Sequence, residues 1–116
     1  MTRGLIFAAV LGFGVAGAQA AGAVTVYVSN EKDNTISVID GDTNKVTATI
    51  PVGQRPRGIV LSHDRTRLYI CASDSKHIEV LDLKTLKITR TLPSGPDPEL
   101  FVLHPDGNPL YVANED

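Results

Sequence analysis

Three histidines and one cysteine are the side chains of this sequence best suited to metal binding or nucleophilic chemistry. Imidazole and thiolate groups are the usual ligands of zinc, which takes about four ligands in one place. The pattern around them places His63 in a turn, His77 at the start of a strand and His104 at the end of another. Because these positions do not converge, we predict no metal site.

Other catalytic patterns are equally weak. The segment from Gly53 to Gly58 resembles the start of a phosphate-binding loop, but it lacks the Lys-Ser/Thr pair, and Pro56 has no amide to donate. There is no Gly-x-Ser-x-Gly motif, and the carboxylates are spaced as turn residues and not as an acid–base pair. We therefore predict no catalytic residue and no cofactor.

Charged residues in and after two proline-rich links are the remaining candidates. Arg55 and Arg57 belong to the first link, and Asp97 and Glu99 lie at the equivalent positions of the second. We call these four residues the charged rim. One hypothesis is that the charged rim orients a partner or an anionic ligand, since loops carry function more often than strands do. The other is that these residues are solvated or form salt bridges between adjacent repeats, which contribute little energy when exposed.

The spacing that separates Arg55 from Asp97 also recurs in other parts of the sequence. Three apolar segments centred on Tyr27, Tyr69 and Tyr111 follow one another at this spacing. The same offset relates residues 36–40 (ISVID) to residues 78–82 (IEVLD) without a gap. A gapless period of about 40–45 residues with four strands per unit is typical of β-propeller blades. We therefore predict an all-β fold of four-stranded antiparallel blades.

Within each repeat, alternating runs and turn residues predict the strands. The run KVTATI and its copy KITRTL alternate as strands with one solvated face do. Asp40 and Thr43 recur as Asp82 and Thr85, so we expect the turn to repeat as well. The proline-rich links should lie outside the strands, and the apolar runs that follow them predict inner strands buried on both faces. The predicted strands are 24–29, 35–40, 45–50, 58–62, 67–72, 77–83, 87–92, 100–104 and 109–114.

Residues 1–20 have the pattern of a secretory signal peptide. Arg3 gives a positive start, and the apolar run at 5–17 is shorter than the roughly 20 residues that span a bilayer. Small residues then end at Ala20, as a signal peptidase requires. We expect cleavage after Ala20 and a periplasmic or secreted chain without a membrane span. The alternative is an uncleaved membrane anchor.

The composition of the mature chain limits its partners. Ten Lys and Arg stand against thirteen Asp and Glu, and no basic run could follow a nucleic-acid backbone. We therefore predict no nucleic-acid partner. Cys71 is the only cysteine, so no intrachain disulfide can form, and its copies are the small residues Ser29 and Ala113. We expect Cys71 to be a buried apolar residue.

The segments VYVSN, LYICA and LYVAN, with ISVID, KVTATIPVG and the Pro-x-Gly links, resemble the YVTN-type β-propeller repeat over nearly all of residues 24–116. More narrowly, SNEKDNTISVID, RPRGIVLS and SGPDPELFVLHPDGNPLYVANED are similar to the periplasmic propeller associated with pyrroloquinoline-quinone (PQQ)-dependent alcohol catabolism. This resemblance implies a non-catalytic binding or scaffold protein. Its partner would be a quinoprotein dehydrogenase, a transport component or a small ligand at the propeller mouth. Cys71-Ala72, Leu83 and Leu86 depart from the repeat, as expected of variation between blades.

The predicted strands fill one blade and parts of two others. We expect residues 21–116 to be a partial propeller, with blade one at 24–50 lacking its inner strand, blade two at 57–93 and the first half of blade three at 99–114. A seven-bladed ring at this period would need about 294 residues. We therefore expect the chain to be the N-terminal part of a longer, seven-bladed protein.

The alternative function is enzymatic. Some seven-bladed propellers with similar repeats are lactonases, and others hold haem in an electron-transfer domain. Either kind would take its catalytic or ligating residues from blades outside this chain. Fold alone does not decide between binding and catalysis.

A partial propeller is also expected to be unstable as a monomer. Each repeat of such a fold is stabilised by its neighbours, and residues 21–116 would expose two wide apolar faces. We expect a purified protein of residues 21–116 to self-associate in analytical ultracentrifugation. A monodisperse monomer with a cooperative thermal unfolding transition would contradict this prediction.

Overall fold

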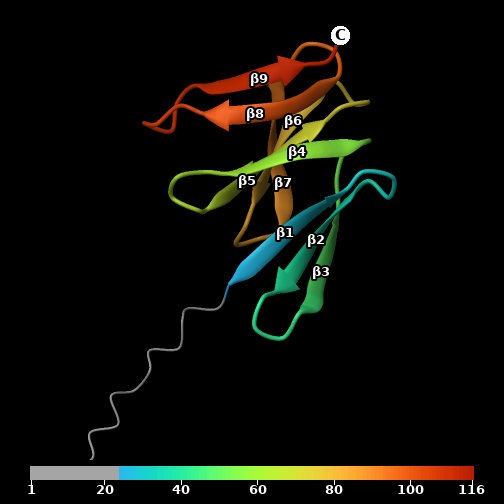
Figure 1. The fold of residues 1–116 in the computed structure, drawn as a ribbon, viewed down its shortest axis with the longest axis vertical. Helices are drawn as coiled ribbons and strands as arrows, with labels where there is room; N and C mark the ends of the chain where they lie inside the picture. Colours follow the sequence, from blue (N-terminus) through green and yellow to red (C-terminus); the bar gives the residue numbers. More distant parts are fainter. Residues whose placement is uncertain (1–23) are drawn as a thin grey trace, which may run out of the picture.

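The computed structural model describes residues 24–116, and all their regular structure is β-strand (Figure 1). The signal peptide predicted for residues 1–20 lies outside the described residues. Within residues 24–116 no helix could serve as a membrane span. The strands are β1 (Thr25–Asn30), β2 (Thr35–Asp40), β3 (Lys45–Pro51), β4 (Pro56–Leu61), β5 (Arg67–Ala72), β6 (His77–Asp82), β7 (Lys87–Pro93), β8 (Pro98–Leu103) and β9 (Leu110–Asn114).

The strands form three antiparallel sheets that follow one another along the chain. The first sheet contains β1 to β3, the second β4 to β7 and the third β8 and β9, each in chain order. Figure 1 shows β4 and β8, the first strands of the second and third sheets, beside each other, and these two strands are in contact. Successive meander sheets with adjacent first strands are the arrangement of propeller blades. The predicted fold class is confirmed.

The sequence repeat is visible in the backbone as well. β5 to β7 begin one full repeat after β1 to β3, and β8 begins one full repeat after β4. Leu86 takes a left-handed conformation, which costs a residue with a Cβ about 1–2 kcal/mol. Leu86 occupies the turn position at which Asn44 takes the same conformation one repeat earlier. Positive φ angles recur at the repeat offset in the pairs Asn34 and Lys76, Asn44 and Leu86, Arg55 and Asp97, and Arg65 and Gly107.

The turns between β2 and β3 and between β6 and β7 are held by one aspartate each. Asp40 Oδ1 accepts hydrogen bonds of 2.8 and 3.1 Å from the amides two and three residues later, and Asp82 Oδ1 accepts the equivalent two at 2.8 Å. The amide of Thr85, followed by that of Lys84, lowers the pKa of Asp82. The predicted repetition of this turn is confirmed.

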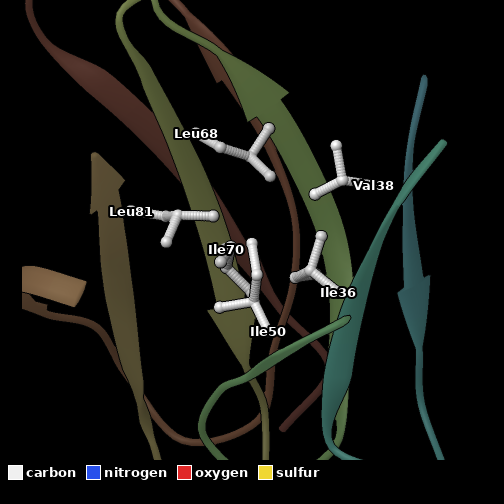
Figure 2. Close-up of a cluster of buried hydrophobic side chains, with 6 residues drawn as sticks. All are labelled: Ile36, Val38, Ile50, Leu68, Ile70 and Leu81. Atoms are coloured by element: carbon white, nitrogen blue, oxygen red, sulfur yellow. The ribbon is translucent and has the colours of Figure 1, made fainter. Parts of the chain in front are cut away.

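The main hydrophobic core lies between the first and second sheets. Figure 2 shows side chains from these two sheets pointing toward one another. Each is at most 7% exposed, and full burial of a side chain of this size stabilises a fold by about 1.5–3 kcal/mol. Each sheet therefore depends on its neighbour. The six residues are Ile36, Val38 and Ile50 of the first sheet and Leu68, Ile70 and Leu81 of the second.

The outermost faces of the first and third sheets are open in residues 24–116. On the first sheet Val26 is 41% and Val46 59% exposed. On the third sheet Leu100, Val102 and Tyr111 are 64%, 65% and 56% exposed. The registers of the strands place each group on a single face. Both open faces are apolar.

Two predictions about the strands are wrong. The link prolines do not lie outside the strands, because Pro51 and Pro93 end β3 and β7, and Pro56 and Pro98 begin β4 and β8. Proline is tolerated on an edge strand or as the first residue of a strand, because no ladder hydrogen bond from its nitrogen is needed there. The inner strands β4 and β8 are not buried on both faces, because each is the edge of its sheet and the third sheet has one face open. The other strand ends lie within two residues of the prediction.

Asp64 lies in the turn after β4, and the pH dependence of stability tests whether its hydrogen bonds stabilise this turn. Its Oδ1 accepts hydrogen bonds from the Ser62 hydroxyl at 2.6 Å and from the Thr66 amide and hydroxyl at 3.0 and 2.7 Å. These bonds, that of Ser62 first, lower the pKa of Asp64 from 3.8 to about 2. A lowered carboxylate pKa stabilises the fold above the pKa of the unfolded chain, and the contribution is lost as the pH falls from about 4 to about 2.

We expect Asp64→Asn to lower the urea midpoint at about pH 6 and to have a progressively smaller effect as the pH falls through this window. Asp42→Asn, at an exposed turn position, is the control. A deficit of Asp64→Asn that stays constant down to about pH 2 would show that the lowered pKa does not stabilise the turn.

Candidate functional site

The charged rim lies at the end of the sheets where the chain passes from one sheet to the next. Arg55 is in the link between β3 and β4, and Asp97 is in the link between β7 and β8. The carbonyl of Arg55 accepts a hydrogen bond of 3.1 Å from the Ser73 amide, and that of Asp97 accepts one of 3.0 Å from the Glu115 amide. Both links are thus fixed by the same backbone contact to the loop or segment after the second strand of the following sheet.

Arg55 is the centre of the charged rim. Its Nη1 lies 3.3 Å from Asp97 Oδ1 and 3.5 Å from Asp74 Oδ1, and its Nε donates a hydrogen bond of 3.1 Å to Glu31 Oε1. The bond to Glu31 is the main cause of the raised pKa of Arg55. Glu31 follows β1, Asp74 follows β5 and Asp97 precedes β8. One guanidinium therefore joins carboxylates from all three blades.

Arg57 forms a second group of ion pairs. Its Nη1 pairs with Glu99 and lies 3.3 Å from Glu115 Oε2. The Oε1 of Glu99 is buried, and Arg57 places a positive charge beside it. Carboxylate oxygens of Asp97, Glu99 and Glu115 lie within 4.8 Å of one another, and the two arginines balance their repulsion.

The geometry thus agrees with the salt-bridge hypothesis for the charged rim. Arg55 pairs with Asp97 and Arg57 pairs with Glu99, each pair joining equivalent positions of successive repeats. The structure brings all four predicted residues together in two adjacent groups of ion pairs.

A contact between Glu79 and Gly53 supports the first link and was not predicted. Glu79 is 8% exposed, and its Oε2 accepts a hydrogen bond of 2.8 Å from the Gly53 amide. The link lies so close that a Cβ on Gly53 would meet Ala72 Cβ at 2.7 Å. The repeat carries no signal for this contact, since the equivalent of Glu79 is Ser37. The only sequence signal for a close contact here was the repeated spacing of the glycines in the links.

The prediction that the histidines do not converge is partly wrong. His63 Nε2 hydrogen-bonds the carbonyl oxygen of His104 at 2.9 Å, at the end of the sheets opposite the charged rim. His104 Nδ1 in turn lies 2.8 Å from Asp106 Oδ1. His77 is elsewhere, 3.4 Å from Glu79. The two histidines meet because turns of successive blades are adjacent, and their separation in the sequence, close to one repeat, could have shown this.

The thiol of Cys71 has no features of a reactive group. Cys71 is fully buried in β5, as predicted. Burial raises the pKa of the thiol to about 12, and a reactive cysteine requires a lowered pKa and solvent access. Cys71 therefore serves as a small packing residue.

Comparison with known proteins places this geometry in a family. A family model for YNCE-like beta-propellers matches residues 5–115. No curated protein matches the chain.

Several solved structures share the fold. A chain of Kuenenia stuttgartiensis hydrazine synthase is 28% identical, with a TM-score of 0.74 over 78% of this chain and 26% of its own length. A functionally unknown protein from Desulfotomaculum acetoxidans is 19% identical, with a TM-score of 0.66 over 78% of this chain and 31% of its own. Dihydro-heme d1 dehydrogenase NirN in complex with DHE is 23% identical, with a TM-score of 0.68 over 78% and 19%. The chain thus spans between about a fifth and a third of these proteins.

A charge exchange tests the pairing of Arg57 with Glu99. We expect Arg57→Glu to lower the urea midpoint, because it places like charges together beside a buried carboxylate oxygen. Adding Glu99→Arg should restore most of the loss, with a coupling on the order of 1 kcal/mol for a pair that is about a quarter exposed. The expected midpoint of the double variant lies above that of either single variant. A double variant as unstable as the two single losses combined would contradict the pairing.

Proposed function

The chain belongs to the YNCE-like β-propeller family, and from this we propose that it is a non-catalytic periplasmic binding or scaffold protein of PQQ-dependent alcohol catabolism. The observation that carries the proposal is the charged rim, a surface of paired charges built from the links of successive blades. Loops at one mouth of a propeller are a frequent site of ligand and partner binding. The periplasmic location rests on the signal peptide predicted for residues 1–20.

The charge that this surface presents to solvent is mainly negative. The two arginines of the charged rim are each engaged by carboxylates. The outer carboxylates Glu31, Asp74 and Glu115 are 51%, 55% and 55% exposed at the side chain. An anionic ligand at the arginines would have to displace these groups, so the surface fits a partner that presents basic residues. Such complementarity acts chiefly on the rate of association.

The partner that we propose is a quinoprotein dehydrogenase or a transport component that acts with it. The similarity of three stretches, residues 29–40, 55–62 and 94–116, to the propeller associated with PQQ-dependent alcohol catabolism supports this choice. A protein partner also suits a surface whose polar groups are already paired, since less ordering is then needed on binding.

A second candidate is a propeller that forms part of a larger enzyme. The 28% identity to a chain of hydrazine synthase favours it. Under this alternative, the chain would position neighbouring catalytic modules, and a lactonase-like or haem-carrying site would lie in other blades. The two candidates differ in whether the protein binds a separate dehydrogenase or itself takes part in turnover.

Binding of a purified quinoprotein alcohol dehydrogenase tests the proposal. We expect the protein to bind it reversibly in biolayer interferometry, with association slowing as salt is raised. Glu31→Gln combined with Asp74→Asn should slow association several-fold, because it removes two exposed charges from the surface.

Asp42→Asn is the matched control, since it removes an exposed carboxylate at the opposite end of the sheets. No binding at any salt concentration, or an equal effect of the control, would overturn the proposal. Turnover of lactones or of haem-linked electron acceptors by the protein alone would favour the enzymatic alternative.

A further inference from the structure

A pocket of about 520 Å³ lies between the first and second sheets, at the end of the sheets opposite the charged rim. We call it the tyrosine pocket. Its volume is within the range of about 300–1,000 Å³ that is usual for small-molecule sites. The lining comes from β1, from the turn between β4 and β5, and from the end of β6 with the turn that follows it. The lining residues are Tyr27, Arg65, Thr66, Asp82, Leu83 and Lys84.

The floor of the tyrosine pocket is apolar and is fixed by the core. Tyr27 of the first sheet and Leu83 of the second are both half-buried, and both pack against the core cluster between these sheets. Burial raises the pKa of the Tyr27 phenol, so this group stays neutral and does not repel an anion. A flat apolar group can therefore lie on an aromatic ring and an aliphatic side chain.

The mouth of the tyrosine pocket carries two cations that the fold does not use. Arg65 and Lys84 are exposed, and neither forms an ion pair within residues 24–116. The one carboxylate of the lining, Asp82, is engaged by its own turn, since its Oδ1 accepts hydrogen bonds of 2.8 Å from the amides of Lys84 and Thr85. The mouth thus has an excess of positive charge.

The repeat shows that the turns form without these side chains. The Leu83 amide donates a hydrogen bond of 3.0 Å to the Thr66 carbonyl, and one repeat earlier the Gly41 amide donates one of 2.7 Å to the Val24 carbonyl. The backbone contact is therefore the same with a glycine as with a leucine. Three of the lining residues differ in chemical type from their repeat counterparts, which are Gly107 for Arg65, Gly41 for Leu83 and Asp42 for Lys84.

We propose that the tyrosine pocket binds a small aromatic carboxylate. The carboxylate of the ligand bridges Arg65 and Lys84, and its ring lies against Tyr27 and Leu83. A planar guanidinium suits a carboxylate, because it can donate two parallel hydrogen bonds to it, and aromatic rings pack well against one another. An inorganic anion would leave the apolar floor uncovered, and a neutral aromatic molecule would leave both cations unpaired.

Equilibrium dialysis of the full chain against 2-naphthoate tests the proposal, with the ligand measured by its own fluorescence. Dialysis reports bound ligand whether or not the protein self-associates. We expect saturable binding with a Kd below about 1 mM. The neutral analogue 2-naphthylmethanol should bind at least about threefold more weakly, because it has no charge to meet the two cations. Absence of saturable binding up to about 1 mM, or equal binding of the neutral analogue, would overturn the proposal.

Variants that carry the repeat's own residue remove each cation while keeping the turn. Arg65→Gly and Lys84→Asp should each weaken binding of 2-naphthoate at least about threefold and leave binding of 2-naphthylmethanol unchanged. Lys76→Asn is the matched control, because Lys76 is an exposed cation at the other end of β5 and takes a positive φ as its counterpart Asn34 does. Binding that neither pocket variant weakens, or that the control weakens equally, would show adhesion elsewhere on the protein and overturn the proposal.

Discussion

Burial of apolar side chains between successive sheets is the interaction on which this structure depends. A sheet of three or four strands has two faces, and neither the first nor the second sheet can cover its own. Ile36 and Ile50 of the first sheet are buried only because Ile70 and Leu81 of the second lie against them. In such repeats, stability is the sum of weak units and strong interfaces between neighbours. Within residues 24–116, the faces at both ends of the stack have no such neighbour.

The same stacking produces the charged rim. Residues at equivalent positions of successive links become neighbours, so an arginine in one link and an acid in the next form a pair without a dedicated scaffold. Exposed pairs of this kind add little stability, but they align each link with the next. The charges of a surface built in this way are paired before any partner arrives.

The period in the sequence predicted most of the fold, because backbone geometry repeats even where side chains change. Leu86 shows this well, since a leucine gives no local reason for a left-handed turn, whereas its repeat-equivalent Asn44 does. The charged rim could also be predicted from the period, because its residues occupy equivalent positions of successive repeats. The contact of Glu79 with Gly53 could not, because it depends on a side chain that occurs in only one repeat. The link prolines show the other limit, since whether an edge strand tolerates proline depends on which of its amides face a neighbour.

Coupling between the two sheets across their shared core is the central claim, and a double-mutant cycle measures it most directly. Ile36 and Ile70 are both fully buried and lie on different sheets of the same cluster. Each of the changes Ile36→Ala and Ile70→Ala removes packing that the other sheet provides. The free energy of unfolding of the double variant should depart from the sum of the two single effects by about 0.5–3 kcal/mol, as contacting residues do. Effects that add to within about 0.3 kcal/mol would show that the sheets are stabilised independently and would contradict this account.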